Sequence, residues 1–184
     1  MEDKTLYTVT VFSENTVGLL GQITSVFIRR FLNIETLSVS PSAIKGIHKF
    51  TITVFSDKET IEKVVKQIDK SIDVLKTFYN TDDELTHQEI ALYKLPTSDF
   101  LKIGSVEKLL REHNAQILEI NENCVVLQKT GHSADTQALF EELNEKIRVL
   151  QFIRSGRIAV NISKTERLSD MLAEIEKRTE FKEE

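Results

Sequence analysis

Hydrophobic residues in the first part of the chain switch between strand-like and helix-like spacing. Residues 6–13 are rich in β-branched and aromatic side chains, which predicts a strand. Apolar residues then recur at helical spacing: Leu19, Leu20, Ile23, Phe27 and Phe31. Residues 33–40 and 47–55 predict two further strands, with a turn at Gly46 between them.

A second helix and a fourth strand complete this unit. Ser56 and Glu59 have the spacing of a capping box, which predicts that a helix begins there. Its apolar positions form a stripe along one face: Ile61, Val64, Val65 and Ile68. Residues 72–79 then predict a strand. The order strand, helix, strand, strand, helix, strand is that of a ferredoxin-like unit.

The same order of elements repeats after a polar stretch, residues 80–84, which is the best candidate for a linker. The second set comprises strands at 88–95, 115–120, 123–129 and 147–153, a final segment at 157–162, and helices at 100–112 and 133–145. The chain is therefore predicted to be an α+β protein with two tandem ferredoxin-like βαββαβ domains, at residues 5–80 and 86–162.

Residues 163–184 are predicted to form a C-terminal helical tail. Ser163 and Glu166 match another capping box. The helix expected over 165–178 has four apolar residues on one face: Leu168, Met171, Leu172 and Ile175. We expect this face to cover a sheet or to pack on a neighbouring chain.

The predicted first sheet also suggests self-association. A four-stranded sheet with both helices on one side leaves its other face open. The strand at 6–13 places apolar residues on both faces, with Leu6 on one face and Tyr7, Val9 and Val11 on the other. We therefore predict that the open face packs on another sheet or chain, and that the protein forms at least a dimer.

Length, charge and hydropathy exclude several classes of protein. The 184 residues suit one ordinary domain or two small ones. The net charge of -5 and the absence of a basic run argue against nucleic acid as a partner. No apolar run approaches the ~20 residues of a membrane span. The polar start, Met1 to Lys4, does not resemble a signal peptide, so a cytoplasmic protein is expected.

No residues indicate catalysis or metal binding. The histidines His48, His87, His113 and His132 are scattered, whereas a zinc site needs clustered ligands. Phosphate-binding and serine-nucleophile motifs are absent from the sequence. The acidic pairs Asp82-Asp83 and Glu141-Glu142 are interpreted as solvated charge, and the single Cys124 as a small buried side chain. We therefore expect a binding or regulatory role, with no catalytic residue and no metal site.

The loop between the first strand and first helix has the best chemistry for a binding site. Asn15 tolerates unusual backbone conformations, and Gly18 lets a ligand approach the backbone closely. The helix that follows offers unpaired N–H groups and the positive end of its dipole, which together suit a carboxylate. Leu19, Leu20 and Ile34 could line an apolar pocket beside it. On these grounds alone, Asn15 and Gly18 could equally serve only to shape a tight turn, and Asn33 could simply end the helix.

A family resemblance is carried by two segments, residues 11–20 (VFSENTVGLL) and residues 28–39 (IRRFLNIETLSV). Together they resemble the first ACT domain of the small, regulatory subunit of acetolactate synthase, also called acetohydroxyacid synthase. Shorter stretches extend the likeness through residues 6–162: residues 51–54, 72–76, 88–94 and 154–156. Positions that depart from the family pattern include Gly21-Gln22 and Ile47-His48-Lys49.

The resemblance implies a sensor built at an interface between the ACT domains of two chains. In that family the effector is valine or a related branched-chain amino acid. The implied effector-binding residues are Asn15, Thr16, Val17, Gly18, Leu19 and Leu20 of one chain, with Asn33 and Ile34 of its partner. Asn15 and Gly18 match the positions that hold the polar end of the amino acid.

The resemblance also implies a second partner and no chemistry in this chain. A separate, larger catalytic subunit would carry thiamine diphosphate, magnesium and FAD, and would condense pyruvate with pyruvate or 2-oxobutyrate. The small subunit would activate it and confer feedback inhibition. Two alternatives remain open: a free-standing ACT-type regulator of another enzyme or of transcription, and a ferredoxin-like enzyme.

Overall fold

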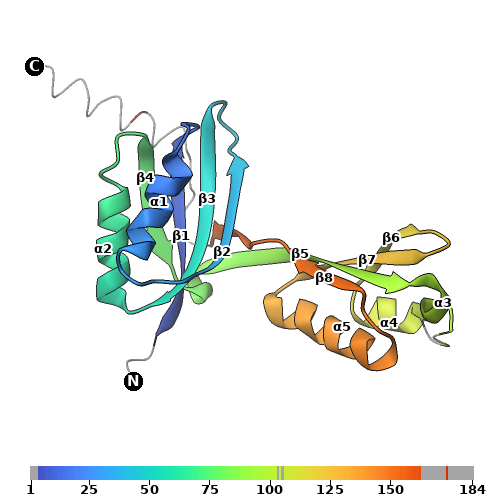
Figure 1. Cartoon of the computed structure of the whole chain (residues 1–184). Coiled ribbons are helices and arrows are strands. Elements are labelled where there is room, and N and C mark those ends of the chain that lie inside the picture. The colour runs from blue at the N-terminus through green and yellow to red at the C-terminus, as the bar shows by residue number, and fades with distance from the viewer. Residues whose placement is uncertain (1–3, 103, 105, 163–172, 174–184) are drawn as a thin grey trace, which may run out of the picture. The chain divides into compact units, whose positions relative to one another are not determined.

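The computed structural model describes residues 4–102, 104, 106–162 and 173 and contains two α+β units (Figure 1). The first unit comprises the described residues up to Thr86 together with those from Ala159 onwards, and the second comprises His87–Ile158. Each unit has an antiparallel sheet with helices on one face. The predicted pair of ferredoxin-like βαββαβ units is thus confirmed.

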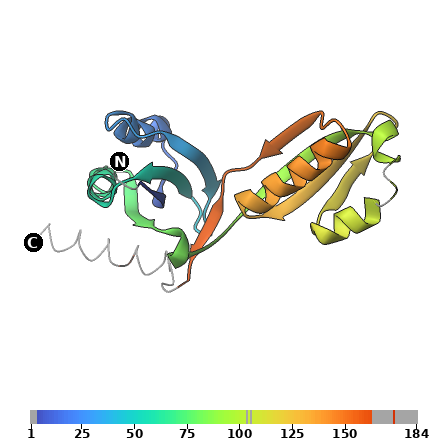
Figure 2. The ribbon, with the colours of Figure 1, turned by 90° about the horizontal axis from the view of Figure 1, so that it is seen from below.

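The first unit contains β1 (Thr5–Glu14), α1 (Leu19–Ile28), β2 (Ile34–Pro41), β3 (Ile47–Ser56), α2 (Lys58–Ile68) and β4 (Val74–Asn80). Its strands lie in the order β2-β3-β1-β4, so that β2 is an edge strand. Figures 1 and 2 show α1 and α2 side by side on one face of this sheet. The core lies between the helices and the sheet, since alternate β1 residues such as Val9 and Val11 pack against Phe27 and Ile61.

The opposite face of this sheet differs from the sequence prediction. Its centre carries threonines, with Thr8 paired to Thr53 and Thr10 paired to Thr51 across β1 and β3. All four threonines are buried. Residues that follow β8 (Gln151–Arg154) return to this face, where Lys49 Nζ donates a hydrogen bond to the Ala159 carbonyl at 2.9 Å. The expectation of an uncovered face is therefore wrong for the centre of the sheet.

The second unit contains most of β5 (Leu85–Pro96), together with α3 (Thr97–Phe100), α4 (Val106–Glu112), β6 (Gln116–Ile120), β7 (Cys124–Gly131), α5 (Ser133–Lys146) and β8 (Gln151–Arg154). Strand β9 (Ile158–Asn161) also pairs with β5, although most of its residues are counted in the first unit. The strand order is β6-β7-β5-β8. Its core packs Tyr93 and Leu127 of the sheet against Leu139 and Leu143 of α5. Each unit therefore buries its own apolar core.

Two elements of the second unit differ from the prediction. The helix expected at 100–112 is divided, because α3 ends at Phe100 and a turn containing Gly104 precedes α4. Glycine weakens a helix interior, which accounts for the break. The strand expected at 147–153 begins only at Gln151, since the preceding four residues carry the chain from α5 back to the sheet. The tail predicted at 163–184 lies outside the described residues, apart from Ala173.

The predicted linker at residues 80–84 is an ordered turn. Asp82–Glu84 forms a 3₁₀ helix, η1. The Glu84 carboxylate accepts hydrogen bonds from the Asn80 side chain at 2.9 Å and from the Thr81 N–H at 3.1 Å. These bonds fix the path of the chain from β4 into β5.

The N-cap of α2 is one residue later than predicted. Ser56 is the last residue of β3 and pairs with Thr5, so it cannot also cap the helix. Asp57 is the N-cap instead, and its Oδ1 accepts a hydrogen bond from the Thr60 N–H at 2.7 Å. This hydrogen bond is the main cause that lowers the pKa of the Asp57 carboxyl below its ordinary value of 3.8.

We predict that Asp57→Ala lowers Tm by roughly 2–4 °C at neutral pH, because it removes the N-cap of α2. Ser56→Ala is the matched control and should leave Tm nearly unchanged, since among the described residues the Ser56 hydroxyl has no hydrogen-bond partner. A lowered carboxyl pKa stabilises the fold above the ordinary pKa and loses its effect in acid. The difference between Asp57→Ala and the unchanged chain should therefore shrink as pH falls, which thermal unfolding monitored by circular dichroism can measure.

Candidate functional site

The loop that joins β1 to α1 is held at both ends by backbone hydrogen bonds. The Asn15 N–H donates to the Gly46 carbonyl at 3.1 Å, which ties the loop to the turn between β2 and β3. The Leu19 N–H donates to the Thr16 carbonyl at 3.3 Å. Gly18 is the N-cap of α1 and has a φ of 87°, in the left-handed region that favours glycine. The loop therefore has a defined shape that depends on Gly18.

The N-terminus of α1 is uncovered as far as the described residues show. In the described part of the chain, no side chain caps Gly18, and the first turn carries no acidic residue. A Cβ added to Gly18 or Gly21 would meet no described atom within 4 Å. Packing against the described residues therefore does not require glycine at either position. The free N–H groups and positive dipole end of α1 remain accessible to a carboxylate.

The predicted site residues in this loop divide into exposed and buried groups. The exposed residues are Asn15, Thr16, Val17, Gly18 and Leu20. The Leu19 side chain is 1% exposed and belongs to the core between the helices and the sheet. Leu19 can therefore contribute only its backbone to a ligand that binds at this loop.

Asn33 and Ile34 lie at the other end of α1. The helix spans ten residues, which corresponds to a length of about 15 Å. Asn33 is exposed, and Ile34 is partly buried against the core. One amino acid is too short to bridge from the loop at Gly18 to Asn33 within one chain. Within a single chain, the predicted site residues thus form two separate groups.

The turn at the C-terminus of α1 exposes Phe31, which the sequence analysis included in the apolar repeat of the helix. The Leu32 N–H donates to the Phe27 carbonyl, and the Phe31 N–H donates to the Ile28 carbonyl, which is the Schellman arrangement. Phe31 occupies its left-handed position with a φ of 55° and is 95% exposed. Glycine is usual at this position, so an exposed phenylalanine there is strained as well as solvated. Sequence reasoning missed this residue because it fits the helical spacing.

The second unit repeats this arrangement with different residues. The Ala115 N–H donates to the Leu110 carbonyl at the end of α4, and Asn114 occupies the left-handed position with a φ of 50°. Asn114 therefore corresponds to Phe31, and Gln116 corresponds to Asn33. Asparagine adopts this conformation more readily than phenylalanine.

Phe31 belongs to an exposed apolar surface along α1. We call these exposed apolar residues the α1 stripe: Leu20 and Ile28 on the helix, Val17 in the loop before it and Phe31 in the turn after it. The neighbouring strand β2 is the edge of its sheet, so one side of its backbone has no partner strand among the described residues. Exposed apolar residues beside an unpaired edge are typical of a protein–protein interface.

A groove of about 530 Å³ lies beside Gly18, between α1 and α2. Its lining includes five polar side chains: Gln22, Ser25, Arg29, Gln67 and Ser71. Gly18 is thus both the last residue of the loop and part of the groove lining. Asn15 and Asn33 do not line the groove, and the sequence analysis did not detect it.

The residues that the sequence analysis considered for catalysis or metal binding lie outside the β1–α1 loop. Within residues 4–102, 104, 106–162 and 173, no three or more His, Cys, Asp or Glu residues are grouped so that they could hold a metal ion. Glu142 is not simply solvated as predicted, because it forms an ion pair with Lys146 and a hydrogen bond with His113. Hydrogen bonds from Lys146 and then His113 lower the pKa of the Glu142 carboxyl. The Lys146 contact lies within α5, and the His113 contact joins α5 to the residue that follows α4, so both serve the fold.

The two glycines at the start of α1 should respond differently to alanine. Gly18→Ala should reduce the free energy of unfolding by about 1–2 kcal/mol, because alanine is strained at a φ of 87°. Gly21→Ala should increase it by roughly 0.5–1 kcal/mol, because Gly21 is an ordinary helical residue beside open space. Urea unfolding of both variants measures the difference, and equal effects would contradict the backbone assignment.

Comparisons with known proteins cover both units. Residues 9–76 match the family described as "AHAS small subunit-like ACT domain", and residues 88–163 match the family described as "Small subunit of acetolactate synthase". The chain is 30% identical over 152 residues to the acetolactate synthase small subunit of Aquifex aeolicus, covering 83% of this chain and 79% of that protein. It is 29% identical over 157 residues to that of Bacillus subtilis, covering 85% of this chain and 89% of that protein.

A solved structure shows the same fold. The crystal structure of the acetolactate synthase small subunit from Thermotoga maritima aligns with a TM-score of 0.77 and 23% sequence identity. The alignment covers 87% of this chain and 99% of that chain. Separately, no helix among the described residues is long and apolar enough to cross a membrane.

Proposed function

This chain belongs to the family of acetolactate synthase small subunits, and on that premise we propose that it is the subunit through which valine inhibits acetolactate synthase. The observation that carries the proposal is the open, left-handed N-terminus of α1 at Gly18. It offers a receptor for an amino-acid carboxylate at the position where the family resemblance expects one.

The proposed valine site is completed by a second copy of the chain. The loop at Gly18 and the residue Asn33 are separated by the length of α1. A two-fold axis beside α1 and perpendicular to it would set the helices of two chains antiparallel, with the same surface of each chain in the interface. The loop of one chain would then meet Asn33 of the other. The dimer would contain two such sites.

The exposed surface beside α1 supports this dimer. The α1 stripe offers apolar contacts, and β2 offers a free strand edge to the β2 of a partner. The strain at Phe31 also has an explanation there, because an exposed aromatic side chain gains most from burial in an interface. We propose that α1 and β2 together form the homodimer contact.

Each part of valine would meet a matching group. The carboxylate would accept hydrogen bonds from the first free N–H groups of α1, and the Asn15 and Asn33 side chains would hold the polar end of the ligand. The branched side chain would contact Leu20 and the partner's Ile34, with Thr16 and Val17 at the rim. The backbone of Leu19 would support the loop.

Inhibition would follow from thermodynamic linkage between two partners. Valine would favour one dimer arrangement, and the large catalytic subunit would favour another. A coupling free energy of about 1–3 kcal/mol, or roughly 5–150-fold in affinity, is typical and would suffice. We assign no cofactor to this chain, and propose that the catalytic subunit holds thiamine diphosphate, magnesium and FAD. A free-standing regulator is the weaker alternative, since the family match extends over both units.

We predict that isothermal titration of the purified chain detects valine binding, and that Gly18→Asp abolishes it. The aspartate would place a negative charge where the carboxylate binds and would strain the backbone. Asn33→Ala should weaken binding at least tenfold, about 1.4 kcal/mol. Gln116→Ala is the matched control, because it occupies the same position in the second unit.

The same variants should separate sensing from activation in the enzyme reconstituted with its large subunit. Gly18→Asp and Asn33→Ala should still activate the large subunit but should make its activity insensitive to valine. Titration with leucine and isoleucine identifies the preferred effector. If both variants were inhibited by valine like the unchanged chain, the site assignment would be wrong.

A further inference from the structure

Two histidines that lie 45 residues apart in sequence meet in the second unit. His87 is on β5, and His132 is the N-cap of α5, directly after β7. Their rings are 4.6 Å apart between centroids and inclined at 78°. The His87 Nε2 and His132 Nδ1 atoms are 3.1 Å apart. Two imidazole nitrogens therefore face each other at the end of this sheet.

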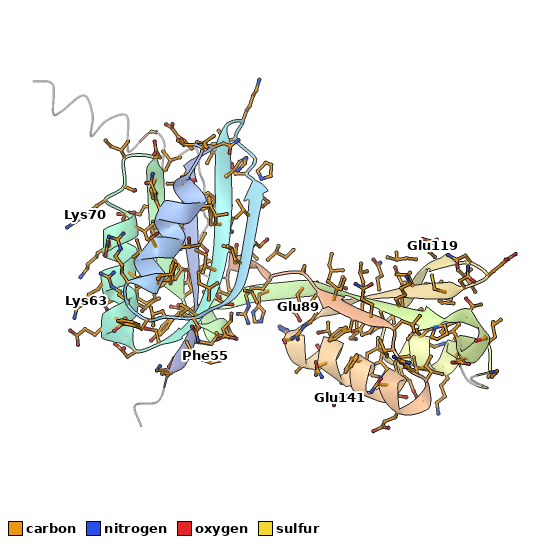
Figure 3. All side chains as sticks on the ribbon, viewed as in Figure 1. Phe55, Lys63, Lys70, Glu89, Glu119 and Glu141 are labelled. Carbon is orange, nitrogen blue, oxygen red and sulfur yellow. The ribbon has the colours of Figure 1, made fainter. Side chains whose placement is uncertain are left out.

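Neighbouring hydrogen bonds hold both histidines in place. The His132 N–H donates to Asp135 Oδ2 at 3.2 Å, which fixes the start of α5. Alternation along β5 puts His87 on the same face as Glu89, which is labelled in Figure 3. Glu89 Oε1 accepts a hydrogen bond from the Thr136 hydroxyl at 3.0 Å and lies 3.5 Å from Arg154. The strand and the helix end are thus joined independently of the two rings.

The separation of the two nitrogens suits a shared metal ion. Zinc binds histidine nitrogen at roughly 2.0–2.1 Å, so two nitrogens of a tetrahedral site lie about 3.3 Å apart. The observed separation of 3.1 Å between the two nitrogens is close to this value, and a small side-chain movement would make up the difference. His132 is exposed and His87 partly exposed, so an ion can reach them from solvent.

We propose that His87 and His132 form a two-imidazole site for a late first-row divalent metal ion, such as Zn²⁺. The ion binds between the two facing ring nitrogens. The proton on one of them moves, by exchange with solvent, to the other nitrogen of the same ring, so both imidazoles bind in the neutral form. Water fills the remaining coordination positions. Bound metal fastens β5 to the start of α5. Neutral imidazole favours zinc, copper and nickel, whereas magnesium prefers oxygen ligands.

The test is titration of the full-length chain, free of any histidine tag, with ZnCl₂ near neutral pH. We expect one ion per chain. His87→Gln and His132→Gln should each weaken binding at least tenfold, because each removes one of the two nitrogen ligands. His48→Gln, which changes a histidine of the first unit, should bind zinc like the unchanged chain. MgCl₂ should not bind at this site.

Three results would overturn the proposal: no zinc binding to the unchanged chain, unchanged affinity in either His87→Gln or His132→Gln, or equal loss of binding in His48→Gln. If a variant does not fold, the imidazole resonances of the unchanged chain provide the answer. Zinc should then shift the ring signals of His87 and His132 and leave those of His48 unmoved. Valine binding is measured separately, so failure of this site does not affect the proposed function.

Discussion

Helix α1 is the element on which both the first core and the candidate sensor depend. Its inner face, with Leu19, Ile23 and Phe27, is buried against the sheet and fixes the helix in one position. That fixed helix keeps the loop at Gly18 and the residue Asn33 apart by its own length, about 15 Å. The same packing that stabilises the unit therefore prevents one chain from closing around a small ligand.

The outer face of α1 supplies what the single chain lacks. The α1 stripe and the free edge of β2 together form a surface suited to a second copy, and an antiparallel pair of α1 helices would bring both groups of site residues together. Ligand binding would then be coupled to the equilibrium between dimer arrangements. A ligand that bridges two chains can shift that equilibrium by its preference for one arrangement, which is the physical basis of inhibition at a distance.

Periodicity in the sequence was sufficient to predict both ferredoxin-like units, because alternating strands and amphipathic helices dominate each core. Periodicity failed where local chemistry or tertiary contacts determine where an element begins or ends, or which side chains are exposed. Gly104 divides a predicted helix, and Asp57 replaces Ser56 as N-cap because β3 extends through Ser56. The exposure of Phe31 depends on its left-handed backbone, which apolar spacing cannot reveal. The meeting of His87 with His132 depends on strand pairing between β5 and β7.

The central claim is that each sensor site uses the loop of one chain and Asn33 of another. Mixing Gly18→Asp chains with Asn33→Ala chains tests it directly, because a heterodimer would contain one site with both defects and one with neither. Titration with valine after subunit exchange should then recover about a quarter of the unchanged number of sites, since random exchange gives about half heterodimers. No recovery in the mixture, with exchange confirmed by mass spectrometry, would show that each site is built within a single chain.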